Sequence, residues 1–196
     1  SVYRNEHSVY FEFEIKVADL QVYFPKFESF AQILMENTKG IWQHLSDYMG
    51  KVLGYDRITV YQFIEGGYGK IIAETRNNDN LESIIGLYQS DFAVLSQARK
   101  VHLKNLCRLT HDIYEEPIRI VSKDGHPIDL LNTNIRTLAK VHSDHLKKVG
   151  IGCNLSFSIL IDNQIWGLIF CQNVRPTRIN LIKREAFVYM IQWAST

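Results

Sequence analysis

The sequence predicts an α+β domain in which an antiparallel sheet of about six strands carries helices on both faces. Residues 54–76 and 151–174 each contain two apolar strands joined by a turn, which is typical of a β-hairpin. Apolar residues spaced by three, four and seven predict helices over 27–53, 91–105 and 178–193. The 196 residues, 46% hydrophobic and 22% charged, suffice for one domain with its own core.

Composition and charge exclude several classes of partner. The net charge of +1 gives no electrostatic footprint for nucleic acid. No apolar run reaches the roughly 18 residues of a membrane span, and the N-terminus lacks the apolar core of a signal peptide. The chain begins without Met, which indicates a piece of a longer protein. We therefore expect a cytoplasmic protein with no nucleic-acid or membrane partner.

The cysteine pattern also favours a cytoplasmic protein. Cys107, Cys153 and Cys171 are odd in number, far apart in the sequence and set among apolar residues. This pattern favours reduced thiols in the core over a disulfide or a metal site.

The N-terminal segment, residues 1–24, contains a run from Ser8 to Val17 in which apolar and polar residues alternate. A period of two predicts an antiparallel strand with one face buried. Pro25 follows as a break.

A long helix is predicted over residues 27–53, with Gly40 as a weak point in its middle and Gly54 at its C-cap. Its apolar stripe fits either the core of this domain or the surface of a second subunit, and both interpretations stay open.

The first hairpin consists of a strand over 54–63, a glycine-rich turn over 65–69 and a return strand over 70–76. The turn is not a phosphate-binding loop, because no helix follows it and the Lys-Ser/Thr ending is missing. Residues 77–90 are expected to form a polar loop.

The middle of the chain predicts a helix, a strand and a long loop. Asp91 is a suitable N-cap for a helix that reaches Asn105, and residues 107–113 read as a short strand. The loop from Tyr114 to Thr133 is about twenty residues long, which is unusual inside a compact domain and indicates a function.

A short polar helix between Arg136 and Gly150 leads into the second hairpin. Alternation along its first strand places an apolar set on one face and a polar set on the other: Leu155, Phe157, Ile159 and Ile161 against Asn154, Ser156, Ser158 and Leu160. The apolar run 165–171 predicts a central strand covered on both faces. A helix that brings His and Arg to the polar face of this hairpin predicts the wall of a ligand pocket.

The last predicted helix, 178–193, follows Pro176 and closes the domain. Its inward stripe is expected to contain Ile179, Ile182, Ala186, Tyr189, Met190 and Trp193.

Arg108 and Arg136 are the first candidates for binding residues. Each lies beside an apolar segment, where an unpaired charge is costly. A guanidinium in such a place needs a carboxylate or phosphate partner. The partner is either a ligand or an Asp or Glu of the same fold, and the residues alone do not decide between them.

His142 and His145 share one helical face at i and i+3 and could supply half of a metal site. No Cys or carboxylate at ligand spacing completes it, so no metal is expected. No cysteine has the setting of a nucleophile beside a histidine, and we expect no catalysis within this chain.

Several motifs resemble the bilin-pocket region of phytochrome GAF domains. These are His142, Leu146 and Gly150 at spacings of four, then Ser156 and Ser158, then the run Ile165 to Gln172, and earlier GYDRITVYQF from Gly54. The resemblance covers about 54–175. It implies a GAF fold, and a sensory role in a phytochrome-like protein.

The resemblance also implies roles for single residues. Arg108 and Arg136 match arginines that hold the two bilin propionates, and Ser156 and Asn154 match hydroxyl positions near a propionate. His142 matches a histidine beside the central pyrrole rings. Tyr61 matches an aromatic residue that lines the chromophore in the family. His145 stands where the family usually has Tyr, and Gln172 stands where it has a histidine.

Four departures weaken the photochemical part of the resemblance. Ser143 stands where plant and cyanobacterial members have the attachment cysteine, and a hydroxyl does not add to a vinyl group as a thiolate does. Bacterial members use a cysteine N-terminal to their PAS domain, outside this chain. The family's Pro-Ala-Ser-Asp-Ile-Pro stretch is residues 90–95 here, with Ala93 in place of the central Asp, and Gln172 is the fourth departure.

These observations leave two hypotheses. The first is a sensory GAF module, the input region of a histidine kinase, with a degenerate bilin pocket that has lost its chromophore. The alternative is a photoreceptor GAF domain that binds biliverdin or another bilin non-covalently. A cyclic-nucleotide GAF domain is a third class, but its Asn-Lys-Phe-Asp-Glu pattern is absent.

The resemblance divides the chain into the tail of a PAS-like domain, residues 1–24, and a GAF domain, residues 25–196. Expected partners are the neighbouring PAS and PHY-like or kinase domains of the same protein. We also expect a homodimer through 27–53 and 178–195, because long apolar stripes on exposed helices usually mark an interface.

Overall fold

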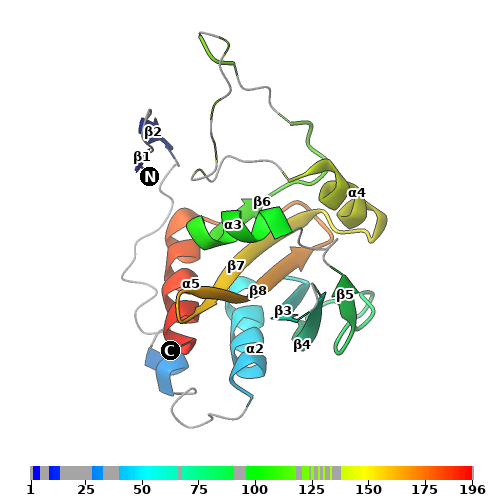
Figure 1. The fold of residues 1–196 in the computed structure, drawn as a ribbon. Helices are drawn as coiled ribbons and strands as arrows, with labels where there is room; N and C mark the ends of the chain where they lie inside the picture. The colour runs from blue at the N-terminus through cyan, green and yellow to red at the C-terminus, as the bar shows by residue number, and fades with distance from the viewer. Residues whose placement is uncertain are drawn as a thin grey trace.

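The computed structural model describes residues 2–4, 9–13, 28–32, 40–65, 68–90, 96–117 and 138–195, with positions 121–123, 125, 128, 130 and 133. Its elements follow the chain in this order: β1 (Val2–Arg4), β2 (Val9–Phe11), α2 (Ile41–Leu53), β3 (Arg57–Ile64), β4 (Tyr68–Arg76), β5 (Tyr88–Ser90), α3 (Ser96–Lys104), β6 (Cys107–Thr110), α4 (Lys140–Lys148), β7 (Cys153–Ile161), β8 (Gln164–Asn173) and α5 (Leu181–Ala194) (Figure 1). Residues 28–32 are also helical.

Six strands form one antiparallel sheet in the order β5-β4-β3-β8-β7-β6, which confirms the predicted fold class. At its centre, β3 of the first predicted hairpin pairs with β8 of the second. Asp56 fixes this junction: its N–H donates to Asn173 Oδ1 over 2.6 Å, and its Oδ2 accepts from the N–H of Val174 over 2.9 Å. The two hairpins are thereby joined into a single sheet.

The turn between β7 and β8 sets the register of the second hairpin. Asp162 and Asn163 have φ values of 51° and 59°, as in a type I′ turn, and Ile161 pairs with Gln164. This turn suits the right-handed twist of the strands, and Asp and Asn tolerate its left-handed backbone better than most residues. The predicted turn is confirmed.

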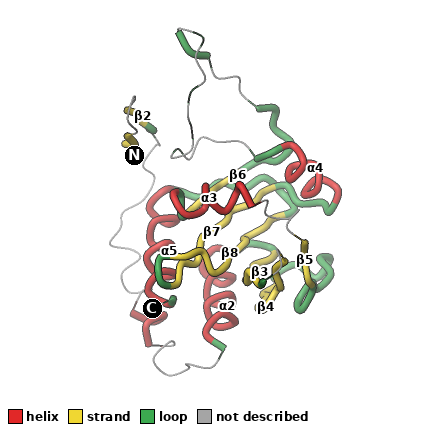
Figure 2. The backbone as a smooth tube through the Cα atoms, viewed as in Figure 1, coloured by secondary structure: helices red, strands yellow, loops and turns green. Residues whose placement is uncertain are grey.

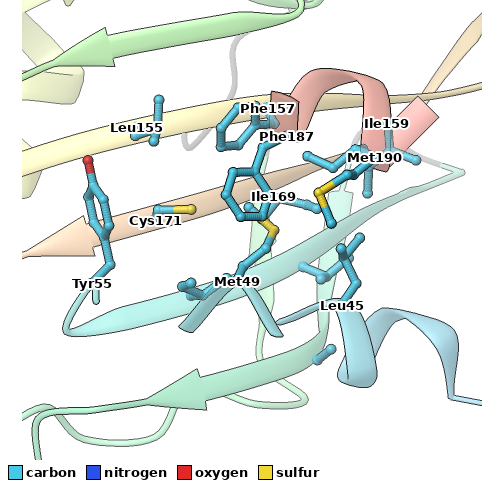
Figure 3. Packing of buried hydrophobic residues seen from close by; sticks show 14 of the residues in the cluster. Leu45, Met49, Tyr55, Leu155, Phe157, Ile159, Ile169, Cys171, Phe187 and Met190 are labelled. Carbon is cyan, nitrogen blue, oxygen red and sulfur yellow. The ribbon is translucent and has the colours of Figure 1, made fainter. Parts of the chain in front are cut away.

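One face of the sheet packs against α2 and α5 and forms the main core (Figure 3). There, Leu155, Phe157 and Ile169 of the sheet cluster with Met49 of α2 and Phe187 of α5, and all five are at most 2% exposed. The predicted inward face of β7, the first strand of the second hairpin, is therefore confirmed at Leu155 and Phe157.

The opposite face is crossed by α3 (Figure 2). The next helix after β6 is α4, which lies near one end of the sheet (Figure 2). Ser158 of β7 ties α3 down, because its N–H donates to Leu106 O over 2.9 Å and its hydroxyl to His102 O over 2.7 Å. Leu146 of α4 is buried with Ile151. Helices thus lie on both faces, as predicted.

The long helix predicted over 27–53 is not continuous. Gly40 precedes α2 with a φ of 80°, a left-handed conformation that interrupts a right-handed helix. Glycine reaches this conformation without strain, so the predicted weak point starts a new helix instead. Gly54, with a φ of 69° and its N–H donating to Gly50 O, confirms the predicted C-cap.

The N-terminal strand also differs from its prediction. β2 covers only three residues of the predicted run and pairs with β1 in a separate two-stranded sheet. Val9, Phe11 and Phe13 are 51%, 63% and 93% exposed, so the predicted burial of this face is wrong for this chain. Among the described residues, no second layer covers the apolar side of this two-stranded ribbon.

Two further predictions need correction. Residues 77–90 were expected to be a loop throughout, but β5 pairs with β4 at the edge of the sheet. In α5, Tyr189 is 71% and Trp193 42% exposed, so these two do not face inward with the rest of the stripe. Residue 91, the predicted N-cap, lies outside the described residues.

The predicted burial of the thiols is confirmed in part. Cys153 and Cys171 are fully buried and Cys107 is half-buried, and all three are thiols rather than disulfides. Burial raises the pKa of Cys153 to about 11, even though its Sγ accepts from Tyr55 and donates to Thr177 O. No helix in the described ranges is long and apolar enough to cross a membrane.

Candidate ligand-binding site

Five predicted site residues lie on one face of the sheet, opposite the main core. Arg108 pairs with Ser156 across β6 and β7, and Asn154 pairs with Gln172 across β7 and β8. Cross-strand partners project to the same face. We call this surface the pocket face, and it consists of Tyr61, Arg108, Asn154, Ser156, Ser158, Phe170 and Gln172.

The polar part of the pocket face is covered from solvent. Asn154 and Ser156 are 3% and 4% exposed, and Gln172 Nε2 lies 3.4 Å from Asn154 Oδ1 as a hydrogen-bond donor. The hydroxyl of Ser156 and the amide groups can donate to a carboxylate. This strip therefore has the donors that an acidic ligand group requires.

The other end of the pocket face is aromatic. Tyr61 is fully buried, its hydroxyl donates to Gln89 O over 3.4 Å, and its ring meets those of Phe63 and Phe170 at centroid distances of 5.2 and 6.2 Å. Gly69 lies directly against this ring, since an added Cβ would overlap it. Close packing therefore holds the Tyr61 ring, and its role in lining a chromophore stays a prediction.

Arg108, His142 and a second histidine, His102, form a cluster of basic side chains beside this strip. Burial lowers the pKa of His142 to about 4, helped by the charges of His145 and Arg108. Burial likewise lowers the pKa of His102 to about 3, helped by Arg108 and His142. Both imidazoles are therefore neutral at physiological pH, and no carboxylate of the described residues contributes to either shift.

His102 was not among the predicted site residues. It is 6% exposed, and its Nδ1 is buried without a hydrogen-bond partner in the described part of the chain. A signal was available, because His102 follows Leu95 by seven residues in the predicted 91–105 helix, which places the two side chains on the same face.

The other residues singled out from the sequence are not among the residues that define the pocket face. His145 is exposed on α4 and reaches the site only through its effect on His142. Ser143 follows His142 on the same helix and is half-buried. Arg136 and Ala93 lie outside the described residues, so their predicted places in the pocket stay predictions.

Arg57 shows what an arginine used for structure looks like in this fold. Its Nε lies 3.3 Å from Glu74 Oε1, both side chains are at most 9% exposed, and its Nη2 donates to Glu82 O over 2.6 Å. Glu74 also accepts from Ser83 Oγ and from the N–H of Ile84. This ion pair fastens the 77–87 loop to the sheet.

The described residues give little support for a metal site. Among the described residues, no group of three or more His, Cys, Asp or Glu is placed to hold a metal ion. A cleft of about 400 Å³ contains none of the pocket-face residues, and is lined by His111, Asp112, Tyr114, Glu115, Pro176, Thr177 and Arg178.

The sequence of residues 37–190 matches the family described as the GAF domain. The chain is 29% identical over 199 residues to a bacteriophytochrome of Pseudomonas aeruginosa, and 29% identical over 203 residues to cyanobacterial phytochrome B of a Nostoc strain. These alignments cover 95% and 98% of this chain but only 27% of each relative. The chain thus spans about a quarter of the length of these relatives.

Among solved structures, the chain resembles the chromophore-binding domain of an unusual bacteriophytochrome from R. palustris. The TM-score is 0.89 at 26% identity, over 99% of this chain and 66% of that one.

Proposed function

This chain belongs to the GAF domain family, and from that premise we propose that it is the sensory module of a phytochrome-like signal-transduction protein. The phytochrome relatives, which align along nearly the whole chain, support this proposal. Because the chain spans only about a quarter of either relative, the output belongs to other domains. In our proposal a PAS-like domain, ending at 1–24, precedes the GAF domain of residues 25–196, and PHY-like and histidine kinase regions follow in the cytoplasm.

The proposed ligand of the pocket face is a bilin such as biliverdin. A bilin is an open-chain tetrapyrrole that absorbs visible light and carries two propionate groups. Arg108 and Arg136 would each hold one propionate, and Ser156 and Asn154 would donate further hydrogen bonds. His142 and Tyr61 would line the rings, with His145 and Gln172 at the periphery.

The observation that carries this proposal is the cluster of Arg108, His102 and His142 beside buried donors. The cation that acts on both His102 and His142 is the Arg108 guanidinium, which can pair with a propionate. Together with the buried Nδ1 of His102, this donor set fits an acidic ligand better than an apolar one.

The same proposal holds that attachment is non-covalent. Ser143 occupies the position beside His142 where a thiol would be needed, and a hydroxyl is too weakly acidic to react in its place.

Biliverdin added to the purified protein tests the proposal. A red-shifted and sharpened visible band is expected, together with no zinc-dependent fluorescence of the protein on a denaturing gel. The absence of any spectral change with excess biliverdin would favour the chromophore-free module. The tight packing of Tyr61 under Phe63 and Phe170, which fills one end of the pocket face, is what favours that second candidate.

The proposed assembly is a homodimer through 27–53 and 178–195. The exposed aromatic side chains of Tyr189 and Trp193 on α5 support it, because large apolar side chains on a helix surface usually mark an interface.

A further inference from the structure

We infer that His102 is a carboxylate-binding residue of the pocket face, and that it takes up a proton from solvent when a bilin propionate binds. This inference rests on the proposed function, since it needs a ligand with a carboxylate. It adds a residue that the family resemblance did not supply and a pH dependence for the site.

The position of His102 is fixed from the backbone. Ser158 Oγ donates to His102 O over 2.7 Å, which holds this turn of α3 against β7. Ser156, two residues before Ser158 and on the same face, pairs with Arg108. These contacts place the backbone of His102 over β7, and the electrostatic effect of Arg108 and His142 on its imidazole indicates that the ring lies near the place where a propionate between Arg108 and Ser156 would be bound.

The imidazole is buried but not satisfied. His102 is 6% exposed, and its Nδ1 has no hydrogen-bond partner among the described residues. A buried polar atom without a hydrogen bond costs roughly 1–3 kcal/mol. A carboxylate oxygen beside Nδ1 would remove this cost, because a protonated imidazole donates from both nitrogens.

The surrounding charges explain why proton uptake should accompany binding. His102 faces Arg108 from β6 and His142 from α4, while Arg99 on its own helix lies over the ring of Phe63, with its guanidinium carbon 4.3 Å from the ring centroid. From the sheet, the neighbours on β7 and β8 are Ser156, Ser158 and Leu168, which do not titrate. Burial, helped by Arg108 and His142, lowers the pKa of His102 to about 3.

A carboxylate adds a negative charge beside the imidazole and raises the pKa of His102 in the complex above its pKa in the free protein. The complex then holds more protons than the separate partners, so affinity increases as the pH falls through the bound-state pKa. One proton gives at most about a tenfold increase in affinity per pH unit.

The test uses isothermal calorimetry of the whole chain with biliverdin in buffers of different ionisation enthalpy, and spectral titrations between about pH 8 and about pH 6. The wild type is expected to take up about one proton per bilin and to bind more tightly at the lower pH. His102→Gln keeps the size and one donor but does not titrate here, so it should bind more weakly and lose both the proton uptake and the pH dependence. His44→Gln, on α2 behind the opposite face, is the matched control and should behave as the wild type.

Biliverdin dimethyl ester separates the two sources of a proton. It has the same tetrapyrrole without carboxylate charges, so it should bind without the His102-dependent uptake. Full proton uptake in His102→Gln, or equal uptake with the ester, would assign the proton to the pyrrole nitrogens or to His142 and overturn the inference. Binding without any proton uptake by the wild type would also overturn it while leaving the bilin proposal intact. A wild type that does not bind biliverdin would overturn both. Circular dichroism and thermal melting would show that each variant is folded.

Discussion

Ser158 and His102 are joined by a hydrogen bond of 2.7 Å, from the serine hydroxyl to the histidine carbonyl, which fastens α3 to the middle of the sheet. The contact spans 56 residues of sequence and both groups are buried. Ser158→Ala should therefore destabilise the domain by about 1–2 kcal/mol, since it leaves a buried carbonyl with one partner fewer. Ser156→Ala, on the same face of the same strand, is the control for stability and should cost less. Chemical unfolding monitored by circular dichroism measures both, and equal losses would contradict the assignment.

Gly69 and Tyr61 provide a second test. An added Cβ at Gly69 would overlap the Tyr61 ring, so Gly69→Ala should destabilise the domain by about 1–3 kcal/mol. In the double variant with Tyr61→Ala the ring is gone, and the cost of the Gly69 substitution should largely disappear. A double-mutant cycle measures this coupling, and additive losses would show that the two positions are independent.

The arginines should control bilin affinity. A charged hydrogen bond contributes about 1.5–3 kcal/mol, so Arg108→Ala and Arg136→Ala should each weaken biliverdin binding about tenfold or more. Arg175→Ala, at an exposed position after β8, is the control. Spectral titration gives the dissociation constants. Unchanged affinity in either pocket variant would show that its arginine pairs with a carboxylate of the protein instead.

Covalent attachment should be restorable at a single position. Ser143→Cys places a thiol directly after His142, and a thiolate fraction at about pH 8 can add to the bilin vinyl group. After incubation with a vinyl-bearing bilin, this variant should give a zinc-fluorescent band that survives denaturation, whereas the wild type should not. A fluorescent wild-type band would refute non-covalent binding.

Dimer formation can be tested on α5. Tyr189→Lys and Trp193→Lys put charges into the exposed aromatic pair and should convert the dimer to a monomer at micromolar concentration. Val141→Lys, which replaces a 59% exposed apolar residue on α4, is the control and should leave the dimer intact. Light scattering reports the mass, and a monomeric wild type would remove the proposed interface.

The sheet was predictable because its strands alternate or are wholly apolar, and because Asp162-Asn163 marks the second turn. Gly40 misled the prediction, since a glycine within an apolar stripe can either weaken a helix or start one. β5 was missed because three residues of an edge strand carry too little periodicity. The alternation of apolar and polar residues in the N-terminal run predicts which face of the strand is buried. It does not predict which strand pairs with β2.

Strand alternation also predicted the face on which some of the candidate site residues lie. The shared face of Ser156 and Asn154 follows from strand alternation, and Arg108 is a candidate because it lies beside an apolar segment, whereas Gln172 came only from the family resemblance. His102 required knowledge of which strand α3 crosses, and that depends on a contact between residues far apart in sequence. Local patterns show which face a side chain occupies, but not what lies across from it.

The pairing of β3 with β8 has a consequence for how the protein is made. The bond from Asp56 to Asn173 closes a loop of 117 residues, and contacts so distant in sequence form late in folding. Until β8 has been synthesised, the β5-β4-β3 and β7-β6 parts of the sheet lack the strand that joins them. The pocket face is therefore assembled after nearly the whole domain has been translated, and any ligand of this face can be bound only by the finished domain.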